Sequence, residues 1–131
     1  MARIQVDFYA IYVHDDADNW PNGTGEIYYQ FRVDNEVVAQ ITRDQPIPVD
    51  SGGTANINQT HVIERPDQPG SNFSVSGSVS EQDGLFSGAD DHAGSFFKVY
   101  SHDNGWNPGH KTVFLSGDGL VVTIHYGIRV L

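Results

Sequence analysis

Cysteine is absent from the sequence, and its absence excludes disulfide bridges, thiolate zinc sites and a cysteine nucleophile. Basic residues are scarce, because seven Lys and Arg face seventeen Asp and Glu and the formal net charge is −10. Nucleic acid is therefore not an expected partner, since phosphate backbones require a basic surface. Strong binding to anionic membranes is not expected either, because it relies on clustered Lys and Arg.

Long apolar runs are also missing. No run reaches the roughly 18 apolar residues that a membrane-spanning helix needs, and the opening segment "MARIQVDFYAIYVHDD" lacks the apolar block of a signal peptide. We therefore expect a soluble protein that is not secreted through a signal peptide. The length of 131 residues predicts a single domain over residues 1–131, large enough to bury a core of its own.

Helical periodicity is absent, whereas period-two alternation of apolar and polar residues recurs between clusters of Gly, Pro, Asn and Asp. In the first such segment Ile4, Val6, Phe8, Ala10 and Tyr12 are expected on one face. The alternation predicts strands at residues 3–13, 26–33, 36–42, 54–64, 72–81, 94–100, 111–116 and 119–131. Eight short antiparallel strands predict an all-β fold, a sandwich or a barrel, and we expect the eight-stranded antiparallel β-sandwich.

Successive connections in an antiparallel sandwich tend to alternate between its two ends. The odd-numbered connections are therefore expected to share one end, and they comprise residues 15–25, 43–53, 82–93 and 117–118. The segment "SHDNGWNPGH" is expected at the opposite end.

Two of these connections, with their flanks, are strongly acidic. Eight of the seventeen carboxylates lie in residues 15–26 and 81–91, and neither segment contains Lys or Arg. Repulsion among them would reduce stability unless a cation offsets it. Calcium accepts about six to eight oxygen ligands in irregular loops, whereas magnesium requires near-octahedral geometry. The predicted calcium ligands are Asp15, Asp16, Asp18, Asn22, Glu26, Glu81, Asp83, Asp90 and Asp91.

Three other interpretations remain beside the calcium site. The acidic loops can be solvated turns that bind nothing, since Asp and Asn hydrogen-bond their own backbone in turns. Six histidines raise a transition-metal alternative, although the sequence has no H-x-H or H-E-x-x-H pattern. His102 and His110 flank Trp106 in a segment that we expect to be packed by its own side chains. No nucleophile with a base at triad spacing is recognisable, so the protein is not expected to be an enzyme.

The second acidic segment, "SVSEQDGLFSGADDHAG", resembles the calcium-binding loop of C2 domains. In that family an acidic residue, then x-Asp, and later Asp-x-x-Gly precede the next strand, and Glu81, Asp83 and Asp91 to Gly94 follow this order. The first segment, "DDADNWPNGTGEIYYQFRV", is similar to the family's first loop, with Glu26 where the family has Asp. The length and the number of strands agree as well, so the resemblance covers the chain.

The resemblance implies a C2-like β-sandwich that holds calcium between two loops and acts as a structural or partner-binding module. An alternative is a calcium-assisted carbohydrate-binding module, in which Trp20 or Trp106 stacks on a sugar ring. Trp20 lies beside Pro21 in the acidic loop and is predicted to contact a ligand, either a glycan or a lipid interface, unless it folds back over the loop. A third hypothesis is a structural or assembly protein in which the metal only stabilises the fold.

Overall fold

The computed structural model describes residues 1–17, 25–82 and 89–131. Its elements are β1 (Ala2–Asp16), β2 (Glu26–Val33), β3 (Glu36–Ile41), β4 (Ile47–Pro48), β5 (Thr54–Arg65), β6 (Asn72–Glu81), β7 (Asp91–Ser101), the 3₁₀ helix η1 (His102–Asn104), β8 (Gly109–Gly117) and β9 (Leu120–Val130). No helix within the described ranges is long and apolar enough to cross a membrane.

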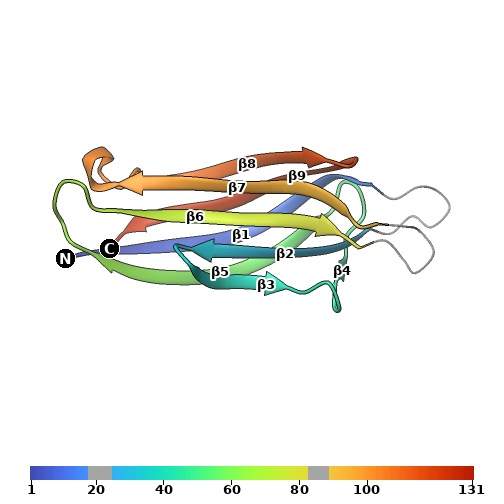
Figure 1. Cartoon of the computed structure of the whole chain (residues 1–131), viewed down its shortest axis with the longest axis horizontal. Coiled ribbons are helices and arrows are strands. Elements are labelled where there is room, and N and C mark those ends of the chain that lie inside the picture. Colours follow the sequence, from blue (N-terminus) through green and yellow to red (C-terminus); the bar gives the residue numbers. More distant parts are fainter. Residues whose placement is uncertain (18–24, 83–88) are drawn as a thin grey trace.

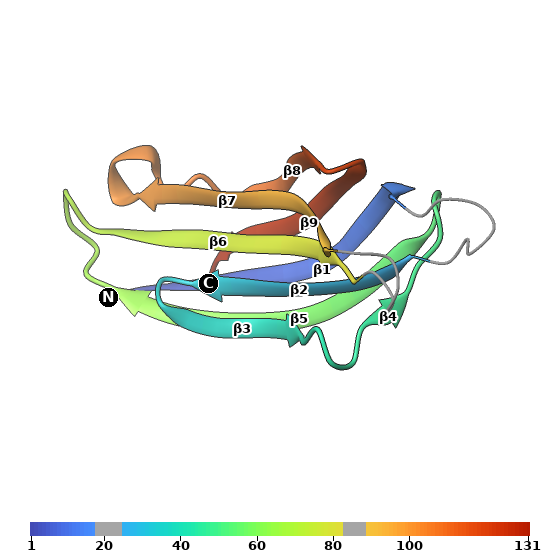
Figure 2. The ribbon, with the colours of Figure 1, turned by 45° about the vertical axis from the view of Figure 1, so that its right-hand side comes forward.

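The strands form two antiparallel sheets that face each other (Figures 1 and 2). One sheet has the order β5-β1-β9-β8, and the other has the order β3-β2-β6-β7 with β4 paired to β2. The prediction of an all-β sandwich is confirmed. The additional strand, β4, pairs only Ile47 and Pro48 with β2. Two residues, one of them proline, are too short a stretch for alternation to reveal.

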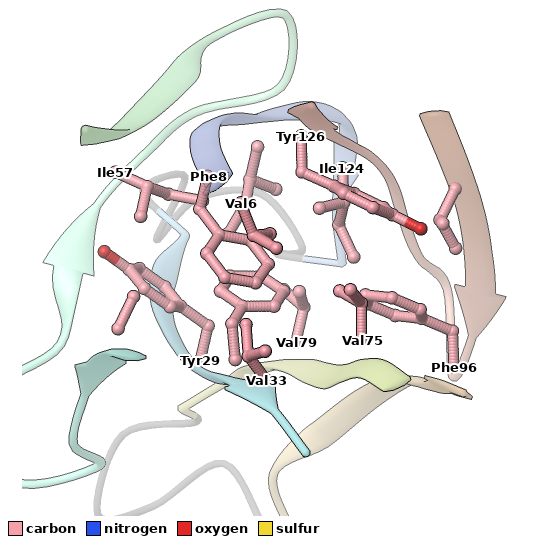
Figure 3. Packing of buried hydrophobic residues seen from close by; sticks show 14 of the residues in the cluster. Val6, Phe8, Tyr29, Val33, Ile57, Val75, Val79, Phe96, Ile124 and Tyr126 are labelled. Carbon is pink, nitrogen blue, oxygen red and sulfur yellow. The ribbon is translucent and has the colours of Figure 1, made fainter. Parts of the chain in front are cut away.

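Alternation places one set of side chains from each sheet between the layers, where aromatic rings fill the space (Figure 3). Phe8 of β1 and Phe31 of β2 are fully buried and stack across the two sheets with ring centroids 5.2 Å apart. Tyr126 of β9 lies 5.9 Å from Phe8 and 5.9 Å from Phe96 of β7. These rings join strands that are distant in sequence, so their burial stabilises the packing of one sheet on the other.

The predicted face of β1 is wrong beyond Phe8. The pairing of β1 with both neighbouring strands shifts by one residue between Phe8 and Ala10, as in a β-bulge. Ile11 and Val13 therefore point inward and are fully buried, whereas Tyr12 is 37% exposed on the outer face. Because a one-residue shift moves every later side chain to the opposite face, a strict period of two could not predict this change.

We predict that Gly77→Ala destabilises the protein by about 1–3 kcal/mol, which is the usual cost of overpacking a core. Gly77 lies opposite Phe31 in the pairing of β6 with β2. A Cβ at Gly77 would overlap Cδ1 of Phe31 and lie 2.9 Å from the carbonyl oxygen of Gln30. Urea unfolding measures the change, with Ser78→Ala on the outer face of the same strand as the control. Equal stability of the two variants would contradict the packing described here.

Candidate metal centre

The described strand ends that flank the odd-numbered connections lie at one end of the sandwich, as the alternation of connections predicts (Figure 1). The backbone N–H of Ser51, which precedes β5, donates to Oδ2 of Asp16 at the end of β1 over 3.2 Å. The N–H of His92 in β7 donates to Oδ2 of Asp118, in the turn between β8 and β9, over 3.1 Å. All the odd-numbered connections thus have described residues at this end, which we call the acidic end.

Asp15 and Asp16 are the last two residues of β1 and belong to the strand, not to the predicted loop. A second shift in the pairing, between Val13 and Asp15, accompanies the burial of Asp16, which is only 5% exposed. Oδ1 of Asp15 instead accepts from the N–H of Ala17 over 3.0 Å, the local bond of an Asx turn. A Cβ at Gly25 would come within 2.6 Å of the Asp16 Cβ, so the end of β1 adjoins the residue before β2.

Three more predicted ligands occupy neighbouring strand ends in the five-stranded sheet. Glu81 of β6 pairs with Ile27 of β2 on one side and with Asp91 of β7 on the other. Glu26 directly precedes Ile27, and its carbonyl oxygen accepts from the N–H of Gln82 over 2.8 Å. Glu81 is 1% exposed, so its carboxyl group is held away from bulk water. The register of the sheet therefore brings acidic residues of β2, β6 and β7 to the acidic end.

Asp90 has a protein counter-charge in this structure. Nε and Nη2 of Arg43 donate to its two carboxylate oxygens over 2.6 and 3.0 Å, and the Tyr28 hydroxyl donates to Oδ2 over 2.7 Å. Partial burial raises the pKa of the Tyr28 phenol above its ordinary value, and the hydrogen bond to Asp90 raises that pKa further. The same carboxylate raises the pKa of Arg43. Asp90, a predicted calcium ligand, is thus engaged by Arg43.

Four predicted contact residues, Asp18, Trp20, Asn22 and Asp83, lie outside the described residues. In residues 1–17, 25–82 and 89–131 no group of three or more His, Asp or Glu side chains could hold a metal ion. The calcium ligand set therefore stays a prediction.

The segment "SHDNGWNPGH" lies at the opposite end, as predicted, where the N–H of His102 donates to the carbonyl oxygen of Ser71 over 2.9 Å. Trp106 is 4% exposed and packs against Phe73 and His102, with ring centroids 6.1 and 5.8 Å apart. The expected packing of the segment by its own side chains holds for His102 and Trp106 only, because His110 belongs to β8 and contacts Tyr9 and His125. Trp106 as a sugar-stacking surface is wrong, because its ring is buried.

Sequence reasoning missed three residues that organise the acidic end: Tyr28, Arg43 and Ser51. Arg43 opens the third connection, which the alternation of connections already places at this end, so its position could have indicated a partner for an acid. The other two contacts depend on side-chain positions across different strands, which spacing along one segment does not reveal.

Comparisons with known proteins identify the fold. The C2A domain of a plant extended synaptotagmin 1 is similar, with a TM-score of 0.53 and 10% identity over 98% of this chain and 93% of that chain. A C2 domain protein from Ramazzottius varieornatus is similar, with a TM-score of 0.51 and 13% identity over 99% of this chain and 89% of that chain. The sandwich is therefore C2-like, as the sequence resemblance implied.

A third structure holds the C2A and C2B domains of extended synaptotagmin 2 with calcium bound. It matches with a TM-score of 0.58 and 14% identity over 99% of this chain and 45% of that chain. No protein-family model and no curated protein matches the sequence. At these identities the likeness shows the fold alone.

We predict that Asp90→Asn lowers the pKa of the Tyr28 phenol and that Arg43→Gln raises it. The Asp90 carboxylate disfavours a phenolate beside it, whereas the Arg43 guanidinium favours one. An NMR titration of ¹³C-labelled tyrosine follows the Tyr28 signal, which Tyr28→Phe identifies. Asp103→Asn at the opposite end is the control and should leave that pKa unchanged. A Tyr28 pKa that does not respond to Asp90→Asn would disprove the contact.

Proposed function

We propose that this C2-like domain binds calcium at the acidic end, between the β1–β2 and β6–β7 connections. One observation carries the proposal: β1, β2, β6 and β7 bring acidic residues of both basic-free segments to the same end of the fold. Like charges gathered in this way repel one another and reduce stability. A divalent cation between them turns this repulsion into attraction.

The composition of the site favours calcium over other divalent ions. Its candidate ligands are carboxylates, an amide and backbone carbonyls, all of them hard oxygen donors. The five described candidates stand at strand ends and the others in the connections that follow, and the flexible coordination of calcium accommodates such a mixed set better than the strict octahedron of magnesium. The calcium-bound extended synaptotagmin 2 structure, which has a similar fold, supports this choice.

The proposed ligands are those that the sequence predicts. Among the described residues these are Asp15, Asp16, Glu26, Glu81 and Asp91, and the two connections would add Asp18, Asn22 and Asp83. Asp90 joins the shell only if Arg43 releases it. The Arg43 side chain is 53% exposed but the Asp90 side chain only 10%, so a divalent cation would have to replace the two hydrogen bonds from Arg43.

The bound ion would order the acidic end and either stabilise it or bridge it to a partner. We propose a module without catalytic activity, because carboxylates that coordinate a metal stay ionised and cannot transfer protons. A glycan or a protein is a more suitable partner than an anionic membrane, because the net charge of −10 opposes approach to anionic lipid. The carbohydrate-binding alternative now depends on Trp20, since Trp106 is buried.

Calcium should raise the thermal stability of the protein. A ligand that binds only the folded state adds about 2.7 kcal/mol at one hundred times its Kd, which corresponds to a shift of several degrees in Tm. Melting curves in EDTA, in calcium chloride and in magnesium chloride at the same ionic strength measure the effect. The calcium curve should shift the most, and coincident calcium and EDTA curves would refute calcium binding.

Asp16→Asn should weaken calcium binding by roughly tenfold or more, because it removes a ligand charge while retaining the shape of the side chain. The matched control is Asp67→Asn at the opposite end, where Oδ1 of Asp67 lies 3.2 Å from Nε2 of His102. Isothermal titration calorimetry with calcium gives both affinities. Equal losses in the two variants would indicate attraction to diffuse negative charge instead of a site.

A further inference from the structure

The outer face of the four-stranded sheet carries two groups of contacting rings, one around His110 and one around His14, which we together call the ring face. Its members come from β1, β8 and β9 and are Tyr9, Tyr12, His14, His110, Phe114 and His125. All members of the ring face belong to strands, and none belongs to the β1–β2 or β6–β7 connection. It gathers half of the six histidines of the chain on one surface.

Two of these histidines, His110 of β8 and His125 of β9, lie close together on adjacent strands. Thr112 of β8 pairs with His125 of β9, and His110 lies two residues before Thr112, so the two histidines are diagonal neighbours on one face. Nε2 of His110 lies 3.0 Å from Nδ1 of His125, and the ring centroids are 5.2 Å apart. Two imidazole nitrogens therefore meet at an exposed position of the sheet.

This separation suits two ligands of one metal ion. Metal–imidazole bonds are about 2.0–2.1 Å long, so nitrogens 3.0 Å apart would subtend an angle of about 90–100° at a shared metal. That is the angle between adjacent ligands in tetragonal copper(II) or nickel(II) coordination. The His110 ring is exposed and the His125 ring is half-buried. One of the two nitrogens donates the hydrogen bond, so metal binding requires that ring to carry its proton on the other nitrogen and both rings to turn toward the ion.

Tyr9 restricts the His110 ring. Its ring stacks on His110 with centroids 5.7 Å apart and an interplanar angle of 11°. The Tyr9 phenol in turn lies against Gly127, where a Cβ would come within 2.6 Å of the phenolic oxygen. The absence of a side chain at Gly127 thus makes room for Tyr9 beside His110. A ring held in this way loses less freedom when it coordinates a metal.

We infer that His110 and His125 form a chelating site for a late first-row transition metal, with copper(II) bound most tightly. Affinity for nitrogen ligands increases along this series to copper(II). Two protein ligands leave coordination positions for water or for a donor from a partner. The negative charge of the protein attracts the cation. This site is chemically distinct from the proposed calcium site, because imidazole nitrogen is a poor ligand for calcium.

The copper(II)–iminodiacetate complex is the probe for this site, since its chelator leaves positions for further donors and so favours paired imidazoles over single ones. Calorimetry in a buffer that contains neither EGTA nor calcium should show that the parent protein binds one equivalent of the copper complex tightly. His110→Gln and His125→Gln should each weaken this binding roughly a hundredfold, as expected when two linked contacts become one. The control is His14→Gln, because the His14 ring lies on the same face and its Nε2 contacts Oγ1 of Thr123 at 2.7 Å.

Electron paramagnetic resonance of the parent complex gives a second readout that needs no variant. Two equatorial nitrogens from imidazole are expected, and a spectrum with one such nitrogen would overturn the proposal. It would also be overturned if His14→Gln lost as much affinity as the paired variants, or if either paired variant bound like the parent. Failure of calcium binding would not affect this result, so the two proposals are tested separately.

Discussion

Repulsion among carboxylates at one end of the sandwich is the constraint on which this account depends. Asp16 and Glu81 are buried there, and Asp91 neighbours Glu81 in the sheet. Charge held away from water is costly unless a counter-charge approaches it. Arg43 supplies one positive charge, to Asp90, although its side chain is 53% exposed. The proposed calcium ion at the same end would act on several acids together and would link the stability of the fold to calcium.

The rest of the fold makes this concentration of charge possible. Phe8, Phe31 and Tyr126 pack between the sheets, so the long strands remain aligned as they run from one end to the other. The antiparallel order then returns the chain to the acidic end at every second connection (Figure 2). The outer faces of the sheets stay available for other chemistry, and on one of them His110 and His125 meet.

The sandwich, its eight longer strands and the clustering of the odd connections follow from alternation and turn residues alone. What could not be predicted has particular physical causes. The shift after Phe8 reverses the faces of β1. Ile11 and Val13 sit at odd positions as the shift requires, but Ala10 and Tyr12 continue the even pattern, so the sequence did not decide between the two faces. The contacts of Arg43 with Asp90 and of His110 with His125 join separate strands, so their register had to be known first. The predicted calcium ligand set is tested only in part, because Asp18, Asn22 and Asp83 lie outside the described residues.

Calcium binding at the acidic end is tested most directly by locating the bound ion in a crystal. Crystals of the protein grown with calcium, or with terbium in its place, would locate bound ions from anomalous scattering. We expect a peak between the β1–β2 and β6–β7 connections, with carboxylate oxygens about 2.3–2.6 Å from calcium. A peak elsewhere, or no peak at a calcium concentration that saturates the calorimetric titration, would contradict it.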